Sequence, residues 1–192
     1  MTFTQEIASF VLPTRTSVSA VPKAGTLAPT SSLLPIPPPD SRPMVVTFLR
    51  HCGCPFAEKT FKLLRELANE PSNSHVRFVA VSHSDDSTTN AWVEALGGPG
   101  SVEILIDAGR EVYALWGLGI SSFSHFMSPS GLWAVYQLGK TDGIHVRSTE
   151  SGSRWQTSGS FAVDGEGIVR WGHPMASAGE IPDFREALRA VN

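Results

Sequence analysis

Apolar and polar positions from residue 44 onward alternate between strand-like runs and helix-like patterns. Short runs rich in β-branched and aromatic residues, typical of strands buried on both faces, occupy 44–49, 76–81 and 103–106. Apolar residues at helical spacing between and after these runs predict three helices. The first begins at about residue 55 and ends before Pro71, and the others cover 88–96 and about 111–116. This order predicts parallel strand–helix–strand units with right-handed crossovers.

The pattern after residue 120 is less regular. Residues 121–138 are rich in aromatic side chains and predict one or two short helices, broken at Pro129-Ser130-Gly131. A polar loop over 139–158 follows. We interpret this stretch as a helical insert in the domain.

The last part of the chain predicts a hairpin and a helix. Two short apolar runs flank Asp164-Gly165-Glu166-Gly167, which is typical of a hairpin with a glycine turn. Residues 181–191 predict a closing amphipathic helix. Together these elements indicate an α/β fold with a mixed central sheet and helices on both faces.

The first 43 residues differ in composition from the rest. They hold eight of the 14 prolines and five charged side chains, and all five tryptophans lie beyond them. Pro35-Ile36-Pro37-Pro38-Pro39 favours polyproline II and is incompatible with a helix or a central strand. We predict a Pro-rich extended arm over 1–43 that makes no contribution to the core, and a folded domain over 44–192.

Composition and charge narrow the classes of function. The net charge of −3 argues against nucleic-acid binding, and no apolar run is long enough to predict a membrane-spanning helix. The first residues lack the basic segment followed by an apolar segment that is typical of a secretory signal peptide. We therefore expect a cytoplasmic protein and no secretion. Two cysteines are too few for a disulfide scaffold, which directs attention to where they lie.

The two cysteines lie in His51-Cys52-Gly53-Cys54-Pro55, between the first strand and the first helix. Proline is favoured as the first helical residue, so Cys54 is predicted to be the N-cap. Free backbone N–H groups and the positive end of the helix dipole favour a thiolate there, and Arg50 and His51 can add positive charge. Cys54 is the predicted nucleophile.

Other interpretations of the cysteines stay open. A free cysteine is often a small buried apolar residue. Cys52 can be a redox partner of Cys54, although a disulfide across a single residue closes a strained ring. No second cluster of Cys and His completes a tetrahedral set, so we predict neither a metal nor a cofactor.

Several segments together carry a resemblance to a known family. They are 48–56 around the cysteines, Val81-Ser82-His83-Ser84-Asp85, Trp116-Gly117-Leu118-Gly119, Tyr136-Gln137-Leu138-Gly139-Lys140 and 155–161. They resemble the peroxiredoxin-like branch of the thioredoxin fold, in particular the AhpC/TSA antioxidant proteins of peroxiredoxin-like 2 type in the form common in fungi. The resemblance covers about 44–190. It implies a thioredoxin-like fold and places Cys54 at the peroxidatic cysteine.

The chain departs from the pattern of typical peroxiredoxins in three places. His51 stands where they carry Thr or Ser three residues before the cysteine. Arg154 and Thr157-Ser158 stand where they bring an arginine beside the cysteine. Ala57 replaces the second cysteine of the Cys-x-x-Cys found in related proteins, which excludes resolution from that position.

Further candidates follow from their place along the chain. His83 follows the second strand and is expected at the same sheet edge as Cys54. Trp155, Gln156 and Thr157 precede the strand at 160–162, where a thioredoxin fold brings a loop against the cysteine. With Arg50, these residues are the predicted substrate-binding set. Capping for His83 and ordinary packing for the others are the alternatives.

His51 carries a hypothesis of its own. If it takes the place of the peroxiredoxin Thr, a protonated imidazole beside Cys54 would lower the pKa of the thiol near neutral pH. The alternative is that His51 points into the sheet and only packs, since it shares a strand face with Leu49.

Two enzyme functions and one binding function compete. The first is a thiol-dependent antioxidant oxidoreductase: Cys54 attacks a peroxide and is reduced by Cys52, glutathione or thioredoxin. The second is a thioredoxin-fold enzyme of small-molecule metabolism without peroxidase activity. It would use His51, His83 and Cys54 for acid–base or nucleophilic chemistry on a metabolite held by the 121–158 insert. The third is a non-catalytic binding module. A homodimer is compatible with each of them.

Overall fold

The structure is a computed structural model that describes residues 17–121, 129–149 and 151–192. Its centre is one five-stranded sheet in the order β3-β2-β1-β4-β5. The strands are β1 (Met44–Phe48), β2 (Arg77–Ser82), β3 (Val102–Ile106), β4 (Gly159–Val163) and β5 (Val169–Pro174). β1 pairs in parallel with β2, and β2 with β3, whereas β4 is antiparallel to β1 and β5. The predicted mixed sheet of a thioredoxin-like fold is confirmed.

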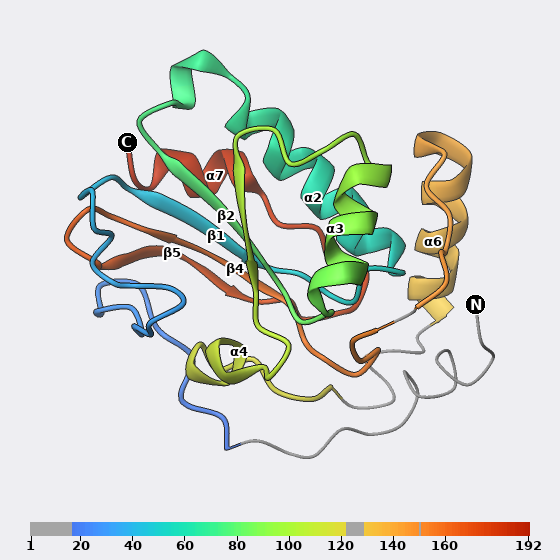
Figure 1. The fold of residues 1–192 in the computed structure, drawn as a ribbon, viewed down its shortest axis with the longest axis horizontal. Coiled ribbons are helices and arrows are strands. Elements are labelled where there is room, and N and C mark those ends of the chain that lie inside the picture. Colours follow the sequence, from blue (N-terminus) through green and yellow to red (C-terminus); the bar gives the residue numbers. More distant parts are fainter. Residues whose placement is uncertain (1–16, 122–128, 150) are drawn as a thin grey trace.

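Helices cover both faces of the sheet (Figure 1). They are α2 (Pro55–Ala68), the short 3₁₀ helix η1 (Pro71–Asn73), α3 (Asp86–Ala95), α4 (Glu111–Leu115), α6 (Pro129–Asp142) and α7 (Phe184–Arg189). The predicted helix before Pro71 matches α2, and α3 begins two residues early because the Asp85 carboxylate caps it through Thr88 N. α7 is shorter than the predicted 181–191.

Strand alternation divides the core into two layers. Val45 and Ala80 point to the layer beneath α2, α3 and α7, where Phe61 and Leu64 are fully buried. Val46 and Val79 point to the other layer, which contains Tyr113 and Trp116 from α4 and its end. The central strands β1 and β2 are therefore buried on both faces, as the mainly apolar sequence runs predicted, with the polar exceptions Thr47 and Ser82 also buried.

Residues 17–43, the described part of the N-terminal arm, belong to this second layer, and they contradict the prediction that the arm makes no contribution to the core. They contain no helix or strand. Yet Ala28, Leu34 and Ile36 are buried in the core, and Gly25 N donates to Val169 O at 2.8 Å. The prolines in this segment are incompatible with a helix or a central strand. They do not prevent the apolar residues between them from being buried.

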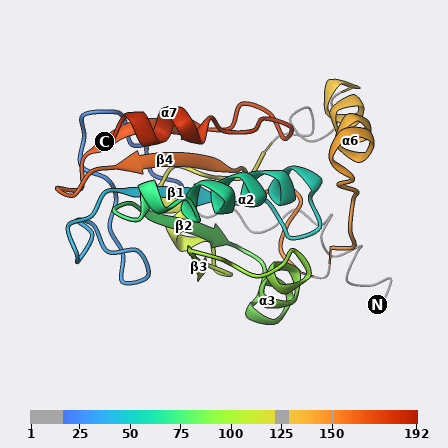
Figure 2. The ribbon, with the colours of Figure 1, turned by 90° about the horizontal axis from the view of Figure 1, so that it is seen from above.

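The insert also differs from its prediction. α6 begins at Pro129 and runs to Asp142, so Pro129-Ser130-Gly131 starts a helix where we expected a break. Proline is well tolerated at the first helical turn. α6 stands beside the first half of α2, where Lys59 pairs with Asp142 at 2.5 Å (Figure 2). The aromatic residues Phe123 and Phe126 of the predicted substrate pocket lie outside the described residues.

The β4–β5 hairpin is confirmed. Asp164 Oδ1 accepts hydrogen bonds from the backbone N–H groups of Glu166 and Ile168, at 3.0 and 2.9 Å. Gly167 has a φ of 87°, a conformation that favours glycine. The turn joins the two strands that bring the 156–158 segment back to the carboxyl end of β1.

Candidate active site around Cys54

Cys54 is the N-cap of α2, as predicted. Its backbone is extended, with φ −83° and ψ 125°, and Pro55 is the first helical residue. The thiol makes no side-chain capping bond, so the first N–H groups of α2 are not satisfied by this cysteine. Cys54 is 5% exposed and is a free thiol. The Cys54 side chain therefore lies at the positive end of a 14-residue helix.

Cys52 faces a different environment. Its Sγ lies 3.8 Å from Ser82 Oγ and 3.9 Å from Thr89 Oγ1, and these two hydroxyls are 2.9 Å apart. Burial raises the pKa of the Cys52 thiol, although the hydroxyls of Ser84, Ser82 and Thr89 oppose this. Cys52 is a free thiol enclosed between β2 and α3. The neutral thiol is its favoured form.

His51 is enclosed and neutral. Burial, and then the charges of Arg50 and Arg154, lower the pKa of its imidazole well below the usual value. His51 Nδ1 and Thr149 Oγ1 share a hydrogen bond of 3.1 Å. The predicted protonated imidazole beside Cys54 is therefore wrong, because the desolvated ring next to two guanidinium groups does not hold a proton near neutral pH.

The structure brings Arg50 and Arg154 together at this end of the sheet. Both are buried, and Arg50 Nη2 donates to Arg154 O at 2.7 Å. The electrostatic effect of both on His51 places their charges near the cysteine turn. Arg154 lies 104 positions from Arg50 in the sequence. The two residues come together because Arg154 precedes β4, which pairs with β1.

His83 lies at the carboxyl end of β2, at the predicted edge. Its Nε2 lies 3.1 Å from both the backbone N and the backbone O of Ser153, and its ring packs edge-on against Tyr113. Burial lowers the pKa of His83 to about 4. These contacts join His83 to the 151–154 segment.

The contacts of Gln156 and Thr157 do not support substrate binding. Gln156 Nε2 lies 3.1 Å from Leu118 O and from Gly119 O, and Thr157 Oγ1 donates to Gly119 O at 2.9 Å. Both side chains thus hydrogen-bond the backbone of residues 118–119 and stabilise that turn. Trp155 is partly exposed, and its backbone N donates to Ser153 Oγ at 3.2 Å.

Sequence reasoning missed the segment that covers the cysteine turn. Arg147 N donates to Gly53 O at 3.2 Å, Ser151 Oγ accepts from Asp85 N at 2.7 Å, and Ser153 reaches His83. The Ser, Thr and Gly composition here indicated only a polar loop. The one signal available was the number of hydroxyl side chains, which says nothing of their partners.

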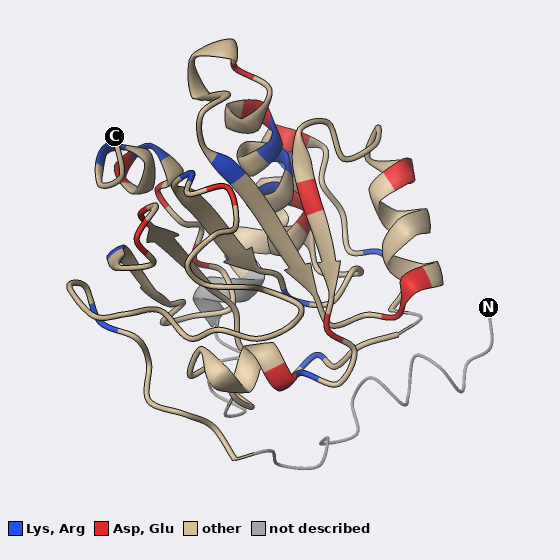
Figure 3. Ribbon diagram, turned by 60° about the vertical axis from the view of Figure 1, so that its left-hand side comes forward, with Lys and Arg blue, Asp and Glu red and all other residues tan. Residues whose placement is uncertain are grey.

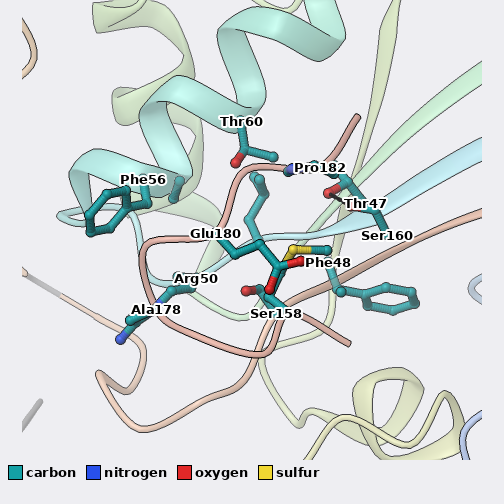
Figure 4. Close-up of a pocket in the computed structure, with 14 residues that line it drawn as sticks. Thr47, Phe48, Arg50, Phe56, Thr60, Ser158, Ser160, Ala178, Glu180 and Pro182 are labelled. Carbon is teal, nitrogen blue, oxygen red and sulfur yellow. Dashed lines mark hydrogen bonds between the residues drawn. The ribbon is translucent and has the colours of Figure 1, made fainter. Parts of the chain in front are cut away.

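A small cavity lies beside the first turn of α2, on its β4 side. Its volume is about 10 Å³, about the space one water needs, and it is lined by Thr47, Arg50, Phe56, Thr60, Ser158 and Ser160 among others (Figure 4). Thr47 Oγ1 and Ser160 Oγ bond each other at 2.7 Å across β1 and β4. The polar side chains that line this cavity are therefore hydroxyls together with the charged groups of Arg50 and Glu180.

Charges on the outer surface are mixed. Acidic and basic residues follow one another along α2, and β2 and β3 carry the pair Arg77–Glu103 at 2.6 Å (Figure 3). Within the part of the chain that the structure describes, no three or more His, Cys, Asp or Glu side chains form a group able to hold a metal ion. Nor do the described helices include one with the length and apolar character that a bilayer crossing requires.

The comparison with protein families decides the assignment. The model of the family described as "AhpC/TSA antioxidant enzyme" matches residues 63–177, more than half of the chain. The chain belongs to the AhpC/TSA antioxidant enzyme family. The predicted resemblance is thereby confirmed at the level of the family, and the fungal form stays a prediction. The matched range begins after Cys54, so it does not include the cysteine turn.

Solved structures place this AhpC/TSA protein among peroxiredoxin folds. A peroxiredoxin-like protein from Aquifex aeolicus matches with a TM-score of 0.58 and 15% identity, over 90% of this chain and 88% of that one. Peroxidoxin BcpB from Mycobacterium tuberculosis matches with a TM-score of 0.56 and 16% identity, over 88% and 96%. At these identities the likeness establishes the fold.

A third similar structure is that of the yeast mitochondrial 1-Cys peroxiredoxin, whose thiol resolving mechanism is described as proceeding via glutathione/thioredoxin systems. It matches with a TM-score of 0.53 and 14% identity, over 87% of this AhpC/TSA chain and 73% of that one. A search of curated proteins found no match.

Proposed function

We propose that this protein is a thiol peroxidase of peroxiredoxin-like type in which Cys54 is the peroxidatic cysteine. The Cys54 thiolate attacks the terminal oxygen of a hydroperoxide, the O–O bond breaks, and the alkoxide or hydroxide leaves and takes a proton. Cys54 becomes a sulfenic acid, oxidised by two electrons, and the peroxide is reduced to an alcohol or water.

The position of Cys54 carries this proposal. Its sulfur is at the start of α2 and makes no side-chain capping bond. The charges of Arg50 and Arg154 act on His51, three residues before Cys54. Free N–H groups at a helix start stabilise an anion, both the thiolate and the oxygen that develops charge during the attack. These backbone groups supply what the Thr of typical peroxiredoxins would supply, since His51 at that position is bonded to Thr149.

We further propose that an external thiol reduces the sulfenic acid. The external thiol attacks the Cys54 sulfur and releases water, and a second thiol then breaks the mixed disulfide and regenerates Cys54. Two observations favour this over resolution by Cys52: the Cys52 sulfur lies between Ser82 and Thr89, and burial raises its pKa. The structurally similar yeast 1-Cys peroxiredoxin, whose thiol resolving mechanism is described as proceeding via glutathione/thioredoxin systems, supports reduction by an external thiol.

The structure gives less support to the alternative function, a thioredoxin-fold enzyme of small-molecule metabolism without peroxidase activity. It needs His51 or His83 as an acid–base group that reaches a substrate, and both rings are buried and bonded to the segment that covers them. The cytoplasmic location and the homodimer stay predictions.

Intact-mass analysis after treatment with stoichiometric hydrogen peroxide tests the proposal. We expect one oxygen to be added in Cys52→Ser as in the unmodified protein, and none in Cys54→Ser. Glutathione should then convert the oxidised protein to a mixed disulfide at Cys54. Loss of two hydrogens without an external thiol would instead assign resolution to Cys52, and equal oxidation of Cys54→Ser would refute the role of Cys54.

A further inference from the structure

A polar segment lies across the turn that carries both cysteines. We call residues 147–149 and 151–154 the strap. Arg147 N donates to Gly53 O at 3.2 Å, and Thr149 Oγ1 bonds His51 Nδ1 at 3.1 Å. The strap thus contacts the two residues that flank Cys52.

The strap continues across the end of β2. Ser84 Oγ donates to Ser151 O at 3.2 Å and accepts from Cys52 N at 3.5 Å, so a hydroxyl links the strap to the backbone of Cys52. Ser151 Oγ accepts from Asp85 N, and Ser153 bonds His83. One segment therefore covers the carboxyl ends of β1 and β2 together, which is the edge where α/β proteins bind ligands.

Gly53 shows how closely the strap packs. A Cβ at this position would lie 2.7 Å from Arg147 O, 2.8 Å from Ser148 O and 2.7 Å from Thr149 Oγ1. The φ of Gly53 is outside the left-handed region, so the backbone itself does not require glycine. The strap alone excludes a side chain between the two cysteines.

The contacts that join the described strap residues to the cysteine turn and the end of β2 are hydrogen bonds. The side chains of the strap are Arg, Ser, Thr and Gly, so no apolar side chain anchors it to the core. Arg147 Nε pairs with Glu58 Oε2 at 2.9 Å, while the Arg147 side chain is 48% exposed. Segments that lack buried apolar contacts open locally more easily than the sheet beneath them.

From these contacts we infer that the strap selects by size what reaches Cys54. While the strap is closed, small oxidants reach Cys54. Bulky hydroperoxides and large thiols reach Cys54 only after the strap has moved away. This inference concerns access to the site and rests on the proposed function for its biological meaning, but its test uses alkylation and does not need peroxidase activity.

Two variants open the strap in different ways. Gly53→Ala places a methyl group against the strap, and Thr149→Val removes the hydrogen bond to His51 with little change of shape. Gly109→Ala is the matched control, because its φ is also outside the left-handed region and its nearest neighbour, Glu111 Cγ, would be 3.7 Å from the new Cβ. All three proteins are compared with the unmodified chain by circular dichroism and thermal melting.

The readout is the rate of alkylation at Cys54 by a small reagent, iodoacetamide, and by a bulky one, fluorescein maleimide, each measured by peptide mass spectrometry. In Thr149→Val we expect the ratio of the bulky to the small rate to rise about fivefold, equivalent to about 1 kcal/mol for one hydrogen bond. Gly53→Ala should raise it at least as far, and Gly109→Ala should leave it unchanged.

An unchanged ratio in both variants, with native melting and circular dichroism, would overturn the inference. So would an equal rise in Gly109→Ala. Failure of the proposed function has a different signature, namely Cys54 that is alkylated as expected but gains no oxygen from peroxide.

Discussion

Acidification should destabilise this protein through His83. The folded state lowers the pKa of His83 from 6.5 to about 4, chiefly because the ring is buried. The unfolded chain therefore takes up the proton first, and the stability contributed by a neutral His83 is lost as the pH falls from about 6.5 toward 4. With 1.36 kcal/mol per pKa unit, the loss is about 2 kcal/mol at about pH 5 and about 3 kcal/mol at about pH 4.

The assay is urea unfolding followed by tryptophan fluorescence at several pH values between about 7.5 and 5. His83→Gln is the comparison, because a glutamine can still accept the hydrogen bond of Ser153 N but does not titrate in this range. His51 is present in both proteins, and its lowered pKa acts in the same direction in each. The difference between the two pH profiles therefore isolates His83.

The expected result is a steeper fall for the unmodified protein, by about 2 kcal/mol at about pH 5. Parallel profiles would refute the reasoning, because they would mean that His83 takes up its proton equally in the folded and unfolded states.

Three further outcomes are expected. Cys54 should react with iodoacetamide faster than Cys52 at about pH 8, because burial raises the pKa of Cys52 and the thiolate is the reactive form; equal rates by peptide mass spectrometry would contradict this. His51→Asn should leave the shape of the pH profile of Cys54 alkylation unchanged between about pH 6 and 8, since a buried neutral His51 does not titrate there, and a lost inflection would restore the imidazolium hypothesis. Leu34→Ala should lower the free energy of unfolding by about 2–5 kcal/mol in urea titrations, because Leu34 is 1% exposed, whereas Val18→Ala at a 43% exposed position should change it little.

The sequence predicted the strands, α2 and the place of Cys54 because local signals determine them. The apolar run at 44–49, Pro55 and the helical spacing after it each act within a few residues. The hairpin turn at Asp164 was predictable for the same reason, since its carboxylate bonds the backbone within four residues.

The surroundings of the cysteine turn were not predictable in the same way. The bond between His51 and Thr149 joins positions 98 apart, and the bond between His83 and Ser153 joins positions 70 apart. No local pattern encodes such pairs, and only the fold decides that His51 is desolvated and hence neutral. Burial of Leu34 was missed because prolines around it marked the segment as irregular, and irregular backbone is compatible with a buried side chain.

The N-terminal arm has a consequence for how the protein is made. Residues 17–43 are synthesised before every strand of the sheet, yet Gly25 and Thr26 bond Val169 on β5, which is synthesised after the other four strands. Until β5 emerges, Ala28, Leu34 and Ile36 and the sheet face that they cover have no complete partner. Exposed apolar surface on an incomplete chain is prone to aggregation and is a substrate for chaperones. This layer of the core can therefore be completed only after β5 has been translated, even though β1 and α2, which flank Cys54, are made well before it.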